Sequence, residues 1–186
     1  NIGLYSVYAS KSKNCSTVAF EPSFFNLQTL IKNIYINHLQ NKIITVPLSV
    51  NDITKNGFFK VPNLDSGHAN SSFNSEYGYD GKPLKFNFVY NTLSLSLDDF
   101  QKLYNLDRPN FLKIDVDGNE HLVLKGAIDI LKTVNEILIE LPGLWKEQTN
   151  ESHKILNDSG FILIKNQKSK NKNYTIDSPN EIWKKL

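Results

Sequence analysis

The chain has 186 residues, of which 40% are hydrophobic and 22% are charged, and its formal net charge at pH 7 is +2. This length predicts one domain with a core of ordinary size. The small net charge gives no electrostatic case for nucleic-acid binding, and no apolar run reaches the roughly 20 residues that cross a membrane. The single cysteine, Cys15, excludes an internal disulfide framework and a multi-cysteine zinc site.

The first part of the chain alternates helical and strand patterns. Leu4 to Lys13 predicts a helix, and Ser16 to Phe20 predicts a short strand that Glu21-Pro22 ends. Apolar residues then recur on one helical face from Ser23, the expected N-cap, to about Leu39. A second strand is expected from Lys42 to Leu48.

The stretch from Ser49 to about Gly81 differs because it is rich in Asn, Ser and Gly. It contains a short expected strand, Phe58 to Val61, and an aperiodic segment, Ser66 to Ser75, that indicates a loop. Leu84 to Leu93 alternates again and predicts a strand. We therefore expect a loop or hairpin insertion at about residues 50–92 within a single domain of residues 1–186. Long loops in compact domains are usually functional or disordered.

The rest of the chain returns to alternating helices and strands. The expected elements are a helix from Ser96 to about Tyr104, a strand from Asn110 to Val116, a helix from Asn119 to Lys132, a strand from Asn135 to Leu141, a helix from about Trp145 to Ser159, a strand from Phe161 to Asn166, a polar turn from Ser169 to Asn173, and a terminal hairpin of Tyr174–Asp177 and Ile182–Lys184. This alternation predicts an α/β fold.

Two places near the N-terminus follow the rule that ligands bind outside the carboxyl ends of strands. The tripeptide Asn1-Ile2-Gly3 runs directly into a helix, where glycine lets a backbone approach a ligand. Glu21 ends a strand, so its carboxylate is placed to accept two ribose hydroxyls. The alternatives are a frayed terminus for the tripeptide and a solvated loop acid for Glu21.

Acidic residues gather where a later strand turns into a helix. Asp115, Asp117 and Glu120 follow an apolar strand, but Gly118 comes too early for an EF-hand calcium loop. Asp117 and Glu120 are equally explained as favourable charge at a helix N-terminus. Asp115 and Glu140 lie within apolar strands, where an unpaired carboxylate is costly, so each needs a partner or a ligand.

The histidines form no metal-binding pair at helical spacing. His121 follows the acidic cluster, and His68 lies in the long loop, so each is a candidate general base. A structural or solvated role is the alternative for both.

The motifs in chain order carry a family resemblance. They are the tail Asn1-Ile2-Gly3-Leu4-Tyr5 of a strand-to-helix turn, Phe20-Glu21-Pro22, Pro47-Leu48-Ser49-Val50-Asn51-Asp52, the loop Ser66 to Ser72, Leu97-Asp98-Asp99, and KIDVDGNEHLVLKGA from Lys113 to Ala127. Together they resemble the FkbM-type S-adenosylmethionine-dependent methyltransferases. The chain departs from that pattern at Asp117, where Glu is usual, and it lacks the first half of the first motif.

The resemblance implies a class I methyltransferase fold, which is a Rossmann-like three-layer sandwich with a mostly parallel sheet and a C-terminal antiparallel hairpin. Its first strand is expected to precede residue 1. The implied cofactor is S-adenosylmethionine. The residues implied to bind it are Asn1 and Gly3 at the methionine, Glu21 at the ribose, Asn51 and Asp52 near the adenine, and Asp115 near the reacting centre.

The expected function is O-methylation of a hydroxyl on a sugar or natural-product-like acceptor. Asp115 is the first candidate to orient or deprotonate that hydroxyl, with Glu140 and His121 as weaker candidates. We expect a cytoplasmic enzyme with a small-molecule or saccharide acceptor, no resident metal, no nucleic-acid partner and no membrane insertion. The alternatives are a nucleotide- or dinucleotide-binding module and a non-catalytic methyltransferase-like protein.

Overall fold

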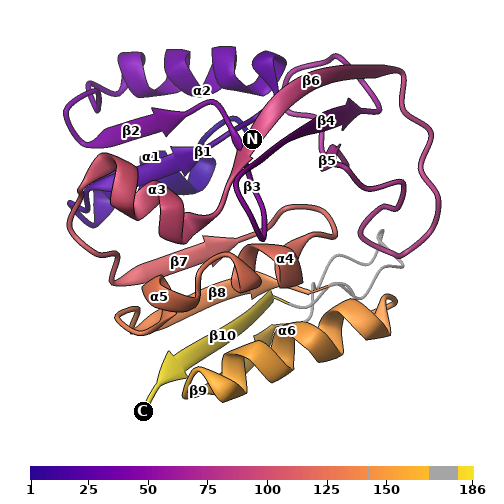
Figure 1. Ribbon diagram of the computed structural model, residues 1–186. Coiled ribbons are helices and arrows are strands. Elements are labelled where there is room, and N and C mark those ends of the chain that lie inside the picture. The colour runs from indigo at the N-terminus through magenta and orange to yellow at the C-terminus, as the bar shows by residue number, and fades with distance from the viewer. Residues whose placement is uncertain (142, 168–179) are drawn as a thin grey trace.

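Figure 1 shows a computed structural model of the chain, in which residues 1–141, 143–167 and 180–186 are described. The N-terminal elements are α1 (Leu4–Ser12), β1 (Thr17–Phe20), α2 (Phe24–Ile36) and β2 (Ile43–Val46). The predicted helices and strands of this part are confirmed, with slightly shorter bounds. β1 and β2 pair in parallel, so that their carboxyl ends lie at the same edge.

A small apolar core holds these N-terminal elements together. Leu30 and Ile34 of α2 are buried against Ala19 of β1 and Ile43 of β2, and Leu39 closes the cluster. The first two residues recur at helical spacing on one face, as the amphipathic pattern requires.

The middle of the chain forms its own sheet. Its strands are β3 (Ser49–Val50), β4 (Lys55–Val61), β5 (Ser72–Phe73) and β6 (Phe88–Leu95), in the order β3-β6-β4-β5. β4 runs antiparallel to β5 and β6, whereas β3 and β6 are parallel. The prediction that Ser66–Ser75 is entirely loop is wrong, because the buried residues of β5 pair with Lys60 and Phe59.

The C-terminal part contains the remaining sheet and four helices. Its elements are α3 (Leu97–Tyr104), β7 (Phe111–Ile114), α4 (Glu120–Lys125), α5 (Ile128–Leu131), β8 (Glu136–Glu140), α6 (Lys146–Asp158), β9 (Phe161–Gln167) and β10 (Asn180–Lys185). The strand order is β7-β8-β10-β9. β7 and β8 are parallel, and β10 runs antiparallel to both of its neighbours. The expected turn Ser169–Asn173 and strand Tyr174–Asp177 lie outside the described residues.

The expectation of a mostly parallel sheet is corrected. The fold is mixed α/β, and its sheets combine the parallel pairs β1–β2, β3–β6 and β7–β8 with antiparallel pairs around β4 and β10. Alternating apolar residues indicate a strand but not its direction, which tertiary pairing decides.

The single helix expected over Asn119–Lys132 is two short helices. A side chain at Gly126 would collide with the backbone oxygen of Asn51, so this position must stay bare at the break. α5 then begins anew because the carboxylate of Asp98 accepts the N–H groups of Asp129 and Ile130, both at 2.9 Å. Free N–H groups at a helix start need such acceptors.

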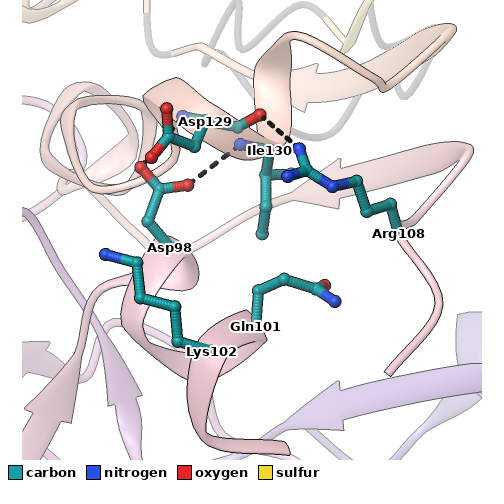
Figure 2. Close-up of a pocket in the computed structure, with 6 residues that line it drawn as sticks. All are labelled: Asp98, Gln101, Lys102, Arg108, Asp129 and Ile130. Atoms are coloured by element: carbon teal, nitrogen blue, oxygen red, sulfur yellow. Dashed lines mark hydrogen bonds between the residues drawn. The ribbon is translucent and has the colours of Figure 1, made fainter. Parts of the chain in front are cut away.

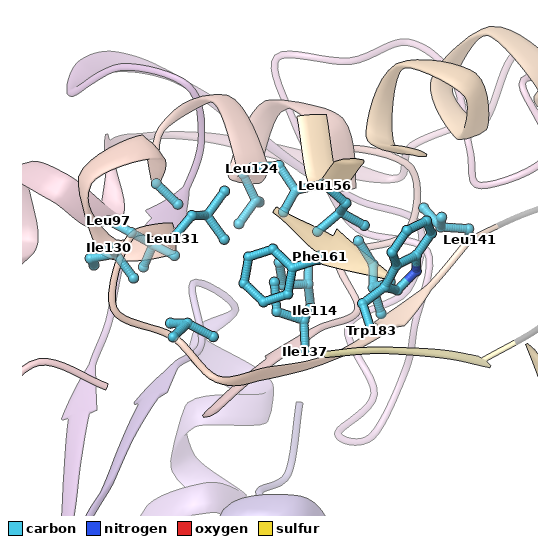
Figure 3. Packing of buried hydrophobic residues seen from close by; sticks show 14 residues of the cluster. Leu97, Ile114, Leu124, Ile130, Leu131, Ile137, Leu141, Leu156, Phe161 and Trp183 are labelled. Carbon is cyan, nitrogen blue, oxygen red and sulfur yellow. The ribbon is translucent and has the colours of Figure 1, made fainter. Parts of the chain in front are cut away.

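The largest core packs α4, α5 and α6 against the C-terminal sheet (Figure 3). Its labelled members include Leu124 and Leu131 of the short helices, Ile137 of β8, Leu156 of α6 and Trp183 of β10. Four of these five are fully buried, and each such side chain stabilises the fold by about 1.5–3 kcal/mol. This half of the molecule therefore provides a rigid base for the carboxyl ends of β7 and β8.

In the described part of the chain, β1 pairs only with β2, and β7 pairs only with β8. The β1–β2 pair and the β7–β8 pair therefore belong to separate sheets, although the strands within each pair are parallel. The further strand expected before residue 1 stays a prediction.

Candidate active site

Glu21 lies at the carboxyl end of β1 and is only 5% exposed. Its Oε1 accepts the backbone N–H of Ser23 at 2.7 Å, and its Oε2 contacts the backbone nitrogen of Asn1. The backbone N–H of Glu21 donates to the oxygen of Val46, which places it beside the end of β2. The carboxylate is therefore fixed between the two strand ends and the N-terminal turn.

The N-terminal turn packs tightly onto α2. Gly3 has a φ of +88°, and a side chain there would collide with Leu30. The side-chain amide of Asn33 donates to the oxygen of Ile2 at 2.8 Å. Only glycine combines this backbone conformation with this lack of space, so Gly3 keeps the backbone of the turn close beside Glu21.

A second group of carboxylates follows β7 and β8. Ile114 pairs with Ile139, so Asp115 and Glu140 come next in register on neighbouring strands. Lys113 lies on the same face as Asp115, since side chains alternate along a strand, and its Nζ is 2.5 Å from the Asp115 carboxylate. The Lys113 ammonium also lies 4.2 Å from the ring centre of Tyr5 in α1.

The pKa values of Glu140, at the end of β8, and of Asp117, two residues after Asp115, are raised toward neutral pH. Burial raises the pKa of Glu140 to about 7, with a further rise from the Asp115 charge and a partial offset from Lys113. Burial raises the pKa of Asp117 to about 6, although a hydrogen bond from the Asn70 N–H opposes the rise. A group with a pKa near the working pH is well suited to accept a proton.

The segment of residues 66–70 connects the two groups of carboxylates. The Gly67 N–H donates to Asn26 Oδ1 at 2.7 Å, and Asn26 Nδ2 donates to the oxygen of His68 at 3.2 Å. The Asn70 N–H donates to the Asp117 carboxylate at 2.7 Å. The segment thus spans from α2 to the turn after β7. His68 takes part through its backbone oxygen, and the residue is exposed.

His121 lies apart from the carboxylates of Asp115 and Glu140. Its Nε2 is 3.8 Å from a carboxylate oxygen of Glu151, and its ring centre is 6.2 Å from that of Trp145. Burial lowers its pKa, and the charges that act on it are those of Glu151, Lys125 and Asp52. The structure therefore places the largely buried His121 ring of α4 against α6.

Asn51 and Asp52 also lie away from Glu21. Asn51 is buried, and its N–H donates to the oxygen of Leu95 at 3.0 Å. Its Oδ1 accepts the N–H of Asp52, whose carboxylate is 3.2 Å from Lys55 Nζ. Among the described residues, no hydrogen bond or ion pair joins either residue to Glu21.

A small pocket between α3 and α5 is a separate feature (Figure 2). It lies next to Arg108, whose guanidinium donates to the backbone oxygen of Asp129 at 3.2 Å. Its volume is about 60 Å³, whereas sites for cofactor-sized ligands occupy about 300–1,000 Å³. Arg108 precedes β7, so the pocket is at the amino end of that strand and is not the candidate site.

The sequence matches the methyltransferase FkbM domain family over residues 1–167. The chain belongs to this family. A search of curated proteins gives no match.

Solved structures share the fold of this FkbM-family chain. A methyltransferase FkbM from Methylobacillus flagellatus KT matches with a TM-score of 0.65 and 16% identity, over 98% of this chain and 40% of that one. A protein of the NADB-Rossmann superfamily from Streptococcus agalactiae gives 0.57 and 14%, over 100% and 58%. A precorrin-6y C5,15-methyltransferase from Geobacter metallireducens GS-15 gives 0.51 and 12%, over 98% and 72%. The chain thus spans less than two thirds of the first two proteins.

The site of this FkbM-family chain includes residues that sequence reasoning missed. Lys113 neutralises part of the acidic cluster, and its spacing of two from Asp115 was the available signal, since such residues share a face of a strand. Asn26 is buried and holds the 66–70 segment, and Asn70 binds Asp117 through its backbone. The sequence carries no local signal for these two contacts, because each joins residues more than 40 positions apart.

The described residues contain neither a metal-binding group of side chains nor a membrane-spanning helix. No group of three or more His, Cys, Asp and Glu residues in the described ranges is arranged to hold a metal ion. None of the helices described is both long and apolar enough to span a bilayer.

Proposed function

We propose that this FkbM-family chain transfers a methyl group from S-adenosylmethionine to a hydroxyl oxygen. The observation that carries the proposal is that two sets of carboxylate side chains lie on one side of the fold. Buried Glu21 follows β1 and the Asp115–Glu140 pair follows β7 and β8. The 66–70 segment contacts Asn1, which itself contacts Glu21, and at its other end binds Asp117. Ligands of open α/β sheets bind at such carboxyl ends.

The residues around Glu21 fit the ribose and methionine parts of the cofactor. One carboxylate oxygen is held by Ser23, and the other faces the nitrogen of Asn1, which a ribose hydroxyl would replace. The bare backbone at Gly3 lets the methionine part approach closely. When bound, the cofactor supplies an electrophilic methyl carbon on a sulfonium. Adenine recognition by Asn51 and Asp52 has less support, because these residues lie next to Leu95 and Lys55.

On the acceptor side, Asp115 orients the hydroxyl and Glu140 receives its proton. Asp115 is fixed by Lys113, which keeps a carboxylate oxygen in a defined position. Glu140 has a pKa of about 7, so its ionised form is available near neutral pH and is basic enough to accept the proton. The hydroxyl oxygen would take the methyl group that S-adenosylmethionine supplies, with S-adenosylhomocysteine as the leaving group, and the hydroxyl proton would pass to Glu140. The proposal gives His121 no part in this step, because its ring lies beside Glu151 and Trp145.

The acceptor in this proposal is a small molecule or a saccharide, and the reaction takes place in the cytoplasm. The family membership and a pair of carboxylates suited to hydroxyl chemistry support this class. We also propose that residues 1–186 belong to one domain, in which a strand that precedes residue 1 lies between β1 and β7. The separate ladders of these two strands support that arrangement.

The test is calorimetry on the full-length protein with S-adenosylhomocysteine and, separately, with NAD⁺. We expect S-adenosylhomocysteine to bind, and Glu21→Gln to weaken binding about 10- to 100-fold, since hydrogen bonds to a charged group contribute about 1.5–3 kcal/mol. Glu136→Gln, at the amino end of β8, is the matched control and leaves binding unchanged. Binding of NAD⁺ alone would favour a dinucleotide-binding module, and binding of neither ligand would refute the proposal.

A further inference from the structure

Glu120 is the most deeply buried acid near the candidate site, with only 2% of its surface exposed. Its Oε1 accepts the backbone N–H of Val116 at 3.1 Å, and its two oxygens accept the N–H of Gly118 at 3.3 and 3.1 Å. Both donors belong to the turn that leads from β7 into α4. The carboxylate therefore faces back onto the turn that contains Asp117.

This turn has a backbone that is costly to maintain without support. Asp117 has a φ of +56° and Gly118 a φ of +118°. A left-handed conformation costs about 1 kcal/mol or more for a residue that is not glycine, and it persists when surrounding contacts fix it. The contacts here are those of Glu120, because its bonds to Val116 and Gly118 enclose Asp117 on both sides.

The turn controls both functional carboxylates on this side of the site. Asp115 directly precedes Val116, so the direction of its side chain depends on how the turn leaves β7. Asp117 accepts the N–H of Asn70 and so holds the end of the 66–70 segment. A change in the turn would move the group that orients the acceptor and release the 66–70 segment, which is bound to Asn26 of α2 at its other end.

A third element fixes the Glu120 carboxylate itself. The side-chain amide of Gln148, on α6, donates to Glu120 Oε2. Gln148 is 2% exposed, and α6 packs against the large core, so this donor has little freedom to move. Glu120 thus connects the turn to the most tightly packed part of the molecule.

We propose that Glu120 is a positioning residue for methyl transfer, whose buried carboxylate holds the 115–118 turn so that Asp115 faces the acceptor. This inference rests on the proposed function of the site. Favourable charge at the helix N-terminus does not explain the arrangement, because the carboxylate is buried rather than exposed and binds N–H groups of the preceding turn. Burial raises the pKa of Glu120 to about 7, so the fold pays for keeping a carboxylate at this position.

The kinetic test compares Glu120→Gln with Glu147→Gln, an exposed acid on α6, in the full-length protein. In Glu120→Gln, one of the two acceptor oxygens becomes an NH₂ group, which faces either the backbone donors or the Gln148 amide, so at least one of the hydrogen bonds that hold the turn is lost. We expect kcat to fall about 100-fold, because a displacement near 1 Å can cost that much, while KM for S-adenosylmethionine changes less than about 3-fold. Glu147→Gln leaves both constants unchanged. A purely structural role would instead lower the active fraction in parallel with the folded fraction and leave kcat per folded molecule unaltered, which would overturn the proposal.

NMR spectroscopy tests the contact between Glu120 and the turn without any substrate. The amide resonances of Val116 and Gly118 are expected to shift together with pH near 7, as Glu120 loses its proton. Two other carboxyl groups near this position have a raised pKa, namely Asp117 on the turn, at about 6, and Glu140 on β8, at about 7. Glu140→Gln separates the titration of Glu140 from that of Glu120, and Asp117 is distinguished by its lower pKa. The shared shift persists in Glu140→Gln and is lost in Glu120→Gln.

Gln148→Met keeps the inference testable if Glu120→Gln fails to fold. It retains the carboxylate but removes a donor that lowers the Glu120 pKa, so the shared amide titration moves to higher pH. If neither Glu120→Gln nor Gln148→Met changes the pH dependence of these amide resonances, the positioning role of Glu120 is wrong, but the proposed function of the site is not affected. Absence of methyl transfer by the wild-type protein would overturn the proposed function, even where the amides titrate as expected.

Discussion

The two regions on either side of the candidate site are packed in different ways. Among its described residues, the C-terminal region buries fourteen hydrophobic residues in one cluster under β7, β8 and β10. The N-terminal region, with β1, β2 and α2, buries only five in its own cluster. α1 leaves Leu4, Tyr5 and Tyr8 at least half exposed, which is unusual for large apolar side chains on a short helix.

The difference in packing between the two regions corresponds to two proposed functions, catalysis and cofactor binding. Asp115 and Glu140 follow strands of the well-packed region, where a catalytic group is held in place by a rigid base. Glu21 follows a strand of the less packed region. The 66–70 segment, which binds Asn26 of α2 and Asp117, bridges the two regions through hydrogen bonds. Substitutions in the two regions should therefore affect different measurements, namely turnover in one and ligand affinity in the other.

The largest expected effect is that of Asp115→Asn in the well-packed region. Asparagine keeps the size of the side chain but removes the charge that pairs with Lys113 and orients the acceptor. We expect kcat to fall about 100- to 10,000-fold, because the hydroxyl is no longer aligned for proton transfer to Glu140, a step that contributes such a factor, while binding of S-adenosylhomocysteine stays unchanged. Steady-state kinetics and calorimetry measure the two quantities on the same preparation.

Asp107→Asn is the control for this substitution, since Asp107 is an exposed acid on the amino side of the same strand. It should alter neither quantity. Equal turnover by Asp115→Asn and the wild-type protein would remove Asp115 from the mechanism. Weaker cofactor binding with normal turnover at saturation would instead assign Asp115 to the same task as Glu21.

The next effect is on stability and compares one substitution in the two cores. Leu131→Ala removes a fully buried side chain from the large cluster, and Leu39→Ala removes a 5% exposed one from the small cluster. Such changes cost about 2–5 kcal/mol, and the cost rises with the cavity left behind. We expect Leu131→Ala to lie at the upper end of that range and Leu39→Ala at the lower end, as measured by urea denaturation. An equal or reversed order would contradict the difference in packing.

The contrast between the regions also explains what the sequence could predict. The periodicity of α2, α3 and α6 and the apolar runs of β7 and β8 predict these elements well, because their burial patterns are regular. The FkbM motifs predict the family, which the match over residues 1–167 confirms. Glu21, Asp115 and Glu140 are correctly placed at strand ends, because each directly follows or ends an apolar run.

Three features were beyond the reach of sequence reasoning. Strand direction is absent from the apolar pattern, so the expectation of a mostly parallel sheet was wrong, although the family resemblance did imply the C-terminal antiparallel hairpin. The break at Gly126 depends on the distant backbone of Asn51. His121 of α4 lies close enough to Asp52 to feel its charge, and no local pattern predicts this, because the two residues are far apart in the chain.

The smallest expected effect is on the pH dependence of stability, and it concerns Glu140 in the well-packed region. Its pKa is about 7 in the folded protein and near 4.5 when unfolded, so the folded protein binds the proton more tightly. Stability from this group is fully present below pH 4.5 and is lost as the pH rises to about 7. Glu140→Gln removes this loss of stability at high pH, because glutamine does not ionise. We expect Tm at pH 8 to rise by about 2–4 °C, which corresponds to about 1 kcal/mol for a half-buried group in a chain of this size, with a smaller rise at pH 5.

Glu136→Gln tests whether this effect belongs to the site or to the strand, because Glu136 lies at the amino end of β8. The control should give the same change in Tm at both pH values. A Glu140→Gln protein that loses stability at pH 8 would mean that the carboxylate is paired rather than strained, and it would then be a poor proton acceptor. A gain in stability together with a loss of turnover would instead show that the well-packed region tolerates an unfavourable charge at the point where the chemistry needs it, which is where strain is expected in an enzyme.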